Sequence, residues 1–361
     1  SQACEPEAFS FALSDGTWAN ADYSAVFGLF HRKFLGEFMK YYFAPLESIT
    51  GYPLRNAHRA LFPETDGYFS PFISSNEEGH YTGRIERDCA VENNNSLVLI
   101  PQIMGNRPEI VHATMEYLEG LGYQECNLNL GCPSGTVVAK GKGSGMLRNP
   151  MVLEDFFQEL FSLLKNSKMR VSIKTRIGLN TEGEWEELFE VFNHFPFSEI
   201  IVHPRTQKQY YSGRVNLSCF QNICKCSKLP LVYNGDVETG EDILFLQEKF
   251  PRIQGIMCGR GLLSNPALFR EARGGKVLEE EEFKDFLSLV EENFAKEIQG
   301  ERNILAKYKE FWSYFAKSYR GGDKGLKEIR KAKNLAEYKA AKYRFFAESH
   351  FQVREGLSLC F

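Results

Sequence analysis

Polar, cationic and glycine residues follow one short apolar run after another along this chain, and these positions could carry chemistry. The runs begin near residues 41, 97, 125, 170, 199, 229 and 254. The residues that follow them are Ala44, Pro45, Leu46, Gln102, Asn129, Cys132, Lys174, Arg176, His203, Arg205, Asn234, Gly235, Asp236, Gly259 and Arg260. If each run is a strand of one parallel barrel, all of these residues meet at a single mouth.

The last two runs end in the glycine-containing turns Asn234-Gly235-Asp236 and Gly259-Arg260-Gly261, each leading into a helix-like segment. Either turn alone is best explained as a tight connection that needs glycine for its backbone. Together, at the final two strands of a barrel, they favour a phosphate site made of backbone N–H groups, helix dipoles and Arg260.

Lys174 would be costly to bury at a strand end without an anion to meet, although a lysine extended along the rim is the alternative. Gln102 and Asn129 offer paired donors and acceptors that suit the edge of a planar heterocycle. Together with the phosphate site, these residues predict a flavin mononucleotide (FMN) lying across the mouth.

Cys132 opens a glycine-rich insertion over residues 131–149, and such long loops at a barrel mouth are usually functional. Cys89, Cys126 and Cys258 fit inert core positions better. The cluster of Cys219, Cys224 and Cys226 could suggest zinc but has no histidine nearby, so no metal site is expected. His203 could be a core histidine, but its place beside Arg205 favours contact with flavin or substrate.

The elements that would position these residues repeat about every 30 residues. Runs near Tyr41, Tyr68, Leu97, Glu125, Arg170, Glu199, Leu229 and Gln254 alternate with helical periodicity over 52–61, 80–90, 107–121, 151–165, 183–194, 216–225, 239–249 and 264–273. Eight such repeats predict an α/β fold, a (β/α)8 TIM barrel, over 39–275. An open, doubly wound sheet is the structural alternative.

The composition of the 361 residues is that of a globular protein, with 43% hydrophobic and 25% charged residues and a net charge of −4. No apolar run approaches the roughly 18–20 residues that span a bilayer. The nine scattered cysteines, and a start without signal-peptide character, predict a cytoplasmic protein with reduced thiols. Residues 1–38 are interpreted as an extension before a natural start at Met39, or alternatively as a genuine N-terminal arm.

Residues 276–361 are predicted to form a C-terminal helical domain. Within 301–355 there are 14 lysines and arginines against 7 acidic residues, a local charge near +7. A solvated helix surface would explain this excess. The interleaved Tyr308, Trp312, Tyr314, Tyr319 and Tyr343 instead suggest contacts to nucleic-acid phosphates and bases.

These segments, taken together, resemble the tRNA-dihydrouridine synthases. The motifs are APLESITGYPLR, IPQIMGN, NLNLGCPSGTVVAKGKGSGML, VSIKTRIG, VHPRT, VYNGD and MCGRGLL. The resemblance covers residues 39 to about 275 closely, and the helical tail matches in kind. Leu46 departs from the methionine of many relatives, and Pro204 replaces a commoner glycine or alanine.

The resemblance implies an FMN-dependent reduction of a specific uridine in tRNA to 5,6-dihydrouridine, with NADPH reducing the flavin. Hydride would pass from the flavin N5 to uracil C6, and Cys132 would protonate C5 as the catalytic acid. The implied FMN contacts are Ala44, Pro45, Leu46, Gln102, Lys174, His203, Asn234, Gly235, Asp236, Gly259 and Arg260. Substrate contacts are expected from Asn129, Arg176, Arg205, Lys140 and Lys142.

Residues 276–361 would then bind tRNA, and the protein is expected to act as a monomer. Two alternatives stay open at this point. A small-molecule flavin oxidoreductase would not need the basic tail, and a non-catalytic RNA-binding barrel would not need Cys132 with intact flavin contacts.

Overall fold

The computed structural model describes residues 39–75, 81 and 83–359. These residues belong to one compact unit that begins at Met39. The extension predicted over residues 1–38 lies outside the described residues.

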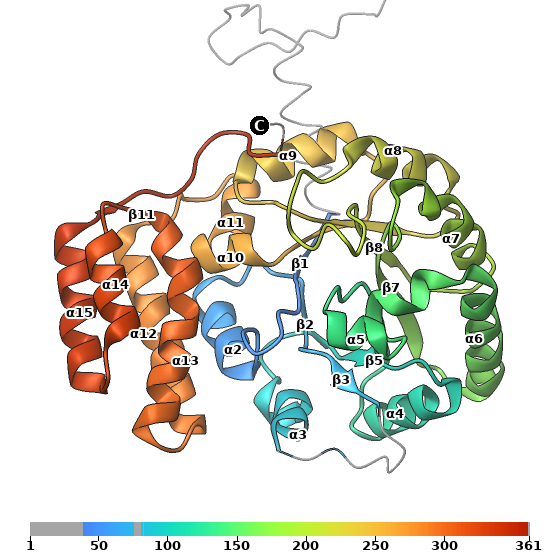
Figure 1. Ribbon diagram of the computed structural model, residues 1–361, viewed down its shortest axis with the longest axis horizontal. Helices are drawn as coiled ribbons and strands as arrows, with labels where there is room; N and C mark the ends of the chain where they lie inside the picture. The colour runs from blue at the N-terminus through green and yellow to red at the C-terminus, as the bar shows by residue number, and fades with distance from the viewer. Residues whose placement is uncertain (1–38, 76–80, 82, 360–361) are drawn as a thin grey trace, which may run out of the picture. The chain divides into compact units, whose positions relative to one another are not determined.

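Short parallel strands close into a barrel (Figure 1). They are β1 (Lys40–Phe43), β2 (Gly67–Phe69), β3 (Ile73–Ser74), β4 (Leu99–Ile100), β5 (Gln102–Met104), β6 (Glu125–Leu130), β7 (Arg170–Arg176), β8 (Ile200–His203), β9 (Leu231–Asn234) and β10 (Gly255–Cys258). The circuit closes because β1 pairs in parallel with both β2 and β10. The predicted α/β barrel is confirmed.

Two of the eight predicted strands are interrupted. The second is β2 followed by β3, and the third is β4 followed by β5, with β2 pairing to β4 and β3 to β5. Pro71 and Pro101 lie in the two breaks. Because proline cannot donate a ladder hydrogen bond, the strands pause there, and ten strands occupy eight positions around the barrel.

Helices follow the strands close to the predicted ranges. They are α2 (Tyr52–Leu61), α3 (Arg84–Cys89), α4 (Pro108–Gly120), α5 (Gly135–Ala139), α6 (Pro150–Leu163), α7 (Trp185–Phe192), α8 (Leu217–Cys226), α9 (Gly240–Lys249), α10 (Arg260–Ser264) and α11 (Leu268–Ala272). The single helix predicted over 264–273 is wrong. Only α11 falls within this range, and α10 ends at the first residue of the range, Ser264, because Pro266 lacks the N–H that would continue the helix.

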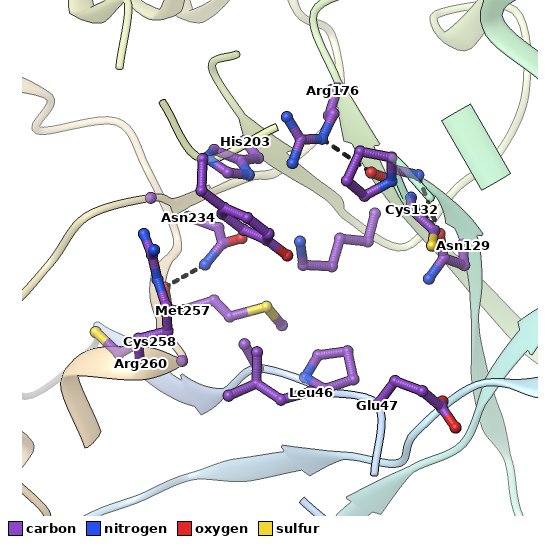
Figure 2. A pocket seen from close by; sticks show the side chains of 18 of the residues that line it. Leu46, Glu47, Asn129, Cys132, Arg176, His203, Asn234, Met257, Cys258 and Arg260 are labelled. Carbon is purple, nitrogen blue, oxygen red and sulfur yellow. Dashed lines mark hydrogen bonds between the residues drawn. The ribbon is translucent and has the colours of Figure 1, made fainter. Parts of the chain in front are cut away.

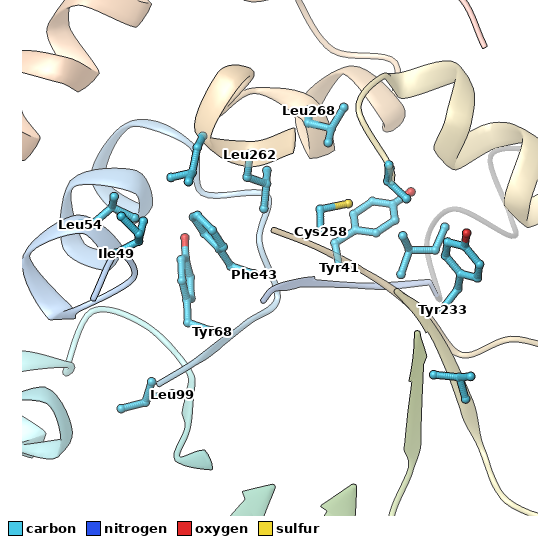
Figure 3. Packing of buried hydrophobic residues seen from close by; sticks show 14 of the residues in the cluster. Tyr41, Phe43, Ile49, Leu54, Tyr68, Leu99, Tyr233, Cys258, Leu262 and Leu268 are labelled. Atoms are coloured by element: carbon cyan, nitrogen blue, oxygen red, sulfur yellow. The ribbon is translucent and has the colours of Figure 1, made fainter. Parts of the chain in front are cut away.

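Two apolar layers hold the strands. Inside the barrel, a cluster contains Tyr42, Ala44, Phe69, Ile100, Ile201, Val232 and Met257. Outside, Tyr41, Phe43 and Tyr233 pack in the larger cluster shared with the surrounding helices (Figure 3). Alternate residues of β1 therefore enter different layers, which is why its sequence is apolar throughout. The polar residues that line the mouth lie at the carboxyl ends of these strands.

The last part of the chain is helical, with α12 (Glu280–Glu297), α13 (Glu301–Phe315), α14 (Asp323–Lys331) and α15 (Leu335–Glu348). The expectation that strands stop after residue 275 is wrong, since β11 (Tyr319–Arg320) pairs antiparallel with β12 (His350–Phe351). Two-residue strands are too short to show a periodic pattern.

The aromatic residues of this helical part have mainly a packing role. Tyr308, Trp312 and Tyr319 are buried, and Trp312 Nε1 donates a hydrogen bond to Tyr338 Oη at 2.8 Å. The expectation that these three rings contact nucleic acid is therefore wrong. Tyr343 is 77% exposed and remains available at the surface.

The helical part packs against the barrel near its mouth. Asn293 Nδ2 of α12 donates to the Pro53 carbonyl of α2 at 3.0 Å. On α13, Lys307 donates to the Ser48 carbonyl and Glu310 accepts from the Ser48 hydroxyl. Ser48 lies in the loop between β1 and α2 that carries Ala44, Pro45 and Leu46, so α13 supports one wall of the mouth. Among the described residues, no helix is long and apolar enough to cross a membrane.

Candidate active site

One cavity opens at the carboxyl ends of the strands and holds about 1000 Å³ of space, including its part open to solvent (Figure 2). The structure brings together in its wall every predicted FMN contact, together with Cys132, Asn129 and Arg176. It does not bring Arg205, Lys140 or Lys142 into the wall. The remaining lining residues are Glu47, Pro71, Phe72, Gly131, Pro133, Tyr211, Val237, Glu238, Met257, Cys258 and Gly261.

The turns after β9 and β10 touch closely enough to require glycine. A Cβ atom on Gly261 would lie 2.2 Å from the Val237 carbonyl oxygen, and one on Gly259 would lie 3.3 Å from Ala44 Cβ. Gly235 has φ +144°, and a Cβ there would lie 2.9 Å from Val215 Cγ1. These two turns therefore present bare backbone to the cavity, the arrangement that a phosphate group needs.

Asp236 holds two arginines at this end of the cavity. Its carboxylate accepts hydrogen bonds from both terminal nitrogens of Arg205 and from Arg260 Nη2, the last at 2.9 Å. The Asp236 carboxylate is thereby neutralised, and Arg260 remains one-third exposed beside the glycine turns.

The prediction that Arg205 meets the substrate disagrees with the structure. Its side chain is 1% exposed, and its guanidinium group also donates to His203 Nε2 at 3.2 Å and to the Gly213 carbonyl. A guanidinium enclosed in this way orients Asp236 and His203 instead of reaching solvent.

Lys174 and His203 both line the cavity, and burial lowers the pKa of each. Among the described residues, Lys174 Nζ makes no hydrogen bond or ion pair, and burial with the neighbouring Arg176 lowers its pKa to about 7. The pKa of His203 is lowered well below its usual value by burial and by Arg176 and Lys174. A neutral His203 can accept the Arg205 hydrogen bond, while Lys174 is left to meet an anion in the cavity.

A chain of side-chain amides fixes the opposite wall. Gln102 Nε2 donates to Asn127 Oδ1 and Gln102 Oε1 accepts from Asn129 Nδ2, both at 2.8 Å. Asn127 Nδ2 donates in turn to Ser172 Oγ at 2.9 Å. Since Gln102 is fully buried in this network, its amide has one fixed orientation toward the cavity.

Asn129 connects this network to Cys132. The backbone N–H groups of Gly131 and Cys132 donate to Asn129 Oδ1 at 3.1 and 2.9 Å. The Cys132 carbonyl accepts from the backbone N–H and the hydroxyl of Ser144 at 3.1 and 2.8 Å. The thiol is therefore attached to a backbone that is held from both sides.

The insertion at 131–149 is more ordered than the predicted loop. It contains α5 and a 3-10 helix, η2 (Gly143–Arg148), and buries Val138, Ser144 and Leu147. These buried side chains and the hydrogen bonds of Ser144 explain why a glycine-rich segment folds here. Lys140 and Lys142 lie between the two helices, outside the cavity wall, with Lys140 exposed.

The surroundings of Cys132 favour the thiol over the thiolate. Burial raises its pKa, opposed by a backbone hydrogen bond from Ser134 and by Arg176 and Lys174. A thiol that keeps its proton suits the role of catalytic acid that the family resemblance implies for Cys132. The three cysteines expected in the core, Cys89, Cys126 and Cys258, are buried as predicted.

Tyr211 and Met257 are among the lining residues that were not singled out from the sequence. Tyr211 is 50% exposed, and its ring centre lies 5.5 Å from the Arg176 guanidinium carbon and 4.7 Å from that of Arg260. Met257 contributes its thioether to the floor. Tyr211 could have been noticed as one of two tyrosines in the polar loop after His203. Met257 could have been assigned to the inside of the barrel from the alternation of inward and outward residues along β10.

The residues present fit a flavin nucleotide. Lys174 has no carboxylate partner among the described residues, whereas the acids of the wall are paired, Glu47 with Arg84 and Glu238 with Arg354. The cavity therefore carries excess positive charge beside a glycine-lined turn, with Leu46 and Met257 as apolar surface for a ring. Such a lining suits an anionic, ring-bearing cofactor, as in enzymes built on a barrel.

Comparisons with known proteins agree with this class. The family described as "Dihydrouridine synthase (Dus)" matches residues 42–359. A "Probable tRNA-dihydrouridine synthase" of Staphylococcus aureus (strain COL) is 27% identical over 86% of this chain and 94% of its own. A "Probable tRNA-dihydrouridine synthase 2" of Bacillus subtilis (strain 168) is 26% identical over 80% of this chain and 86% of its own. The solved structure of morphinone reductase covers 68% of this chain and 88% of its own, with 12% identity and a TM-score of 0.47. The chain belongs to the dihydrouridine synthase family, whose members are flavin-dependent enzymes.

Proposed function

We propose that this protein reduces a specific uridine in tRNA to 5,6-dihydrouridine, with FMN as its cofactor and NADPH as the reductant. The observation that carries the proposal is the cavity itself. Its wall brings together Lys174, which has no hydrogen-bond or ion-pair partner among the described residues, the glycine-containing turns after β9 and β10, and Cys132, whose pKa is raised by burial. When bound, FMN supplies hydride to the uracil ring.

The proposed FMN contacts fall into two groups. Asn234, Gly235, Asp236, Gly259 and Arg260 would hold the phosphate, and Ala44, Pro45, Leu46, Gln102, Lys174 and His203 would surround the ring and its chain. Asp236 has its carboxylate occupied by two arginines, so it would contribute backbone N–H and keep Arg260 aimed at the phosphate. Lys174 would place its ammonium group against an electron-rich edge of the ring.

Cys132 would supply the proton that completes saturation of the uracil. Its thiol holds a proton at Sγ at neutral pH, because burial raises its pKa. Asn129 and Ser144 hold the backbone on either side, so the thiol is presented from a fixed position. A correctly placed general acid accelerates such a step by about 10²–10⁴-fold.

The target uridine must leave its stack to enter a barrel mouth, at a cost of a few kcal/mol. The half-exposed Tyr211 lies in the cavity wall, where it would contact the base or its flanking phosphates. Arg176 lies in the same wall but is 1% exposed and donates to the Gly131 and Thr206 carbonyls, so it would hold Tyr211 and the wall in place beside the base. Lys140 and Lys142 would act outside the cavity, on phosphates beyond the target nucleotide. The basic helices α14 and α15 would hold the rest of the tRNA.

The experiment that tests this function uses purified protein, NADPH and unmodified tRNA transcripts, followed by ribonuclease digestion and mass spectrometry that maps dihydrouridine in the resulting oligonucleotides. Dihydrouridine at one position in wild-type samples, and none in Cys132→Ala samples, is the expected result. Reduction of a free pyrimidine or an enone at the same rate without tRNA would instead assign the site to small-molecule substrates.

A further inference from the structure

The last described residues return from the helical part to the barrel. This segment, 352–359, is here called the C-terminal strap (Figure 1). It leaves β12 with the Gln352 N–H donating to the Ser318 carbonyl at 2.8 Å. Further along, Arg354 pairs with Glu238, and Leu359 is 6% exposed. The strap thus spans from the end of α13 to the connection between β9 and α9.

Its end is held by one buried carboxylate, that of Asp242 in α9. Asp242 Oδ1 accepts from the backbone N–H groups of Ser358 at 2.7 Å and Leu359 at 3.1 Å. Asp242 Oδ2 accepts from the Ser358 hydroxyl at 2.5 Å. A fully buried carboxylate is stable only when hydrogen-bonded, and the strap supplies three of its hydrogen bonds.

The same carboxylate also holds the segment 234–238, here called the phosphate turn. Asp242 Oδ2 accepts from the backbone N–H groups of Glu238 at 2.9 Å and Thr239 at 3.1 Å. The Ser358 hydroxyl lies 3.4 Å from the Asp236 carbonyl oxygen. The strap therefore contacts the outer side of the turn whose inner side lines the cavity.

The phosphate turn has a backbone that needs such support. Asp236 adopts φ +48°, a left-handed conformation that is uncommon for residues other than glycine, and Gly235 has φ +144°. Strained turns persist when neighbouring contacts over-determine them. Here those contacts come from Arg205 and Arg260, which bind the Asp236 carboxylate, and from Ser358 on the outside.

We propose that the C-terminal strap is a positioning element for the phosphate turn, acting through Ser358 and Leu359 on Asp242, and that it sets the affinity of the protein for the phosphate of FMN. This inference rests on the proposed function, because it assumes that the phosphate binds at this turn. It also makes flavin retention depend on the helical part, to which the strap is attached at Ser318. The role belongs to Ser358 and Leu359 as positioning residues, since neither lines the cavity.

The test compares FMN with riboflavin, which has the same ring and no phosphate. Dissociation constants for both are measured by flavin fluorescence on the full-length chain stripped of flavin, on Ser358→Ala, and on a chain ended after Glu355. Ser313→Ala is the matched control, because its hydroxyl is exposed on α13, far along the chain from the strap, and donates to the Glu310 carbonyl of the same helix. Circular dichroism and thermal unfolding of each variant establish that it is folded.

The FMN dissociation constant is expected to rise about fivefold in Ser358→Ala and about tenfold or more in the shortened chain, with riboflavin binding changed less than about twofold. The phosphorus NMR signal of bound FMN should shift toward that of free FMN in both variants. A wild-type chain that binds FMN and riboflavin equally would overturn the phosphate site and the proposed function's use of it. A wild-type preference for FMN that survives in both variants, or equal weakening of both ligands, would overturn the role of the strap alone.

Discussion

Hydrogen bonds to its backbone hold Cys132 in position, whereas its proposed chemistry belongs to the side-chain thiol. Asn129 and Ser144 bind the peptide groups on either side, while Cys132 is partly buried in the cavity wall. A change confined to the side chain should therefore leave the wall intact.

Cys132→Ala should retain bound flavin and tRNA affinity but lose turnover by about 10²-fold or more. The flavin absorbance of the purified variant, its tRNA binding by filter retention, and single-turnover formation of dihydrouridine check the three parts. Unchanged turnover would show that another group supplies the proton.

Lys174 offers a prediction with a definite sign. Its pKa is lowered from 10.5 to about 7, so between these values the unfolded chain carries a proton that the folded, flavin-free chain lacks. The contribution of Lys174 to flavin-free stability therefore rises with pH over that window. An anionic ligand bound beside Lys174 should raise its pKa again and restore the charge of its ammonium group.

FMN binding above pH 7 should accordingly take up a proton, and its affinity should fall by up to about tenfold per pH unit. Calorimetric titration at pH 8 in two buffers of different ionisation enthalpy measures the uptake directly. Lys174→Met should bind FMN more weakly and with no proton uptake at this step. Equal proton uptake in both proteins would assign the titration to another group.

At the scale of elements, the insertion between β6 and α6 presents Cys132 because α5 and η2 pack tightly beneath it. Gly143 has φ +57°, and a Cβ there would lie 3.0 Å from both Cβ and the carbonyl oxygen of Cys132. The segment thus depends on a glycine whose replacement would displace the thiol.

Gly143→Ala should reduce turnover by about tenfold to a hundredfold while flavin content stays normal, because small misplacements of a catalytic group are costly. Gly120→Ala is the matched control, since a Cβ at Gly120 in α4 meets nothing within 4 Å. Steady-state kinetics and the flavin-to-protein ratio of both variants decide the point. Normal turnover in Gly143→Ala would mean that the insertion adapts.

The elements that could be predicted from the sequence are those with a local signal. The eight strand positions follow from their apolar runs. Because residues at the carboxyl ends of parallel strands meet at one mouth, Gln102, Lys174 and Gly259 could be predicted to lie together, and all three line the cavity. Single-chain patterns carry no information about which charges neutralise each other. Arg205 was therefore expected to contact the substrate, although its guanidinium is buried against Asp236.

Other features depend on contacts between distant parts of the chain, and such contacts produce no hydrophobic periodicity in the sequence. Ser358 contacts Asp242, which lies more than a hundred residues earlier in the chain. Trp312 is buried against α15, a contact that the sequence does not reveal, so the basic and aromatic tail was interpreted as an RNA-binding surface. Tyr211 stood in an irregular loop, where only tertiary structure places it between Arg176 and Arg260.

At the scale of the whole molecule, a net-negative protein carries a basic helical surface. On α14, Lys324, Lys327 and Lys331 are exposed and, within the described part of the chain, make no ion pair. Their spacing of three and four residues places them on one face of the helix. This face would contact tRNA phosphates.

Lys327→Ala with Lys331→Ala should weaken tRNA binding by about tenfold and reduce the slope of log affinity against log salt by about 1.5 to 2. Lys165→Ala with Lys168→Ala is the matched control, since these exposed lysines precede β7 at the end of the barrel away from the mouth. Flavin content should be unaffected in both. An equal loss in the control pair would indicate only a general charge effect.

The central claim is that this cavity passes electrons from NADPH through a bound flavin to uridine in tRNA. It is tested most directly by following the flavin absorbance of the purified protein without oxygen. The absorbance should bleach on addition of NADPH and return when unmodified tRNA is added, but not when free uridine is added. Return with free uridine or an enone as fast as with tRNA, or a protein that takes up no FMN, would contradict the account.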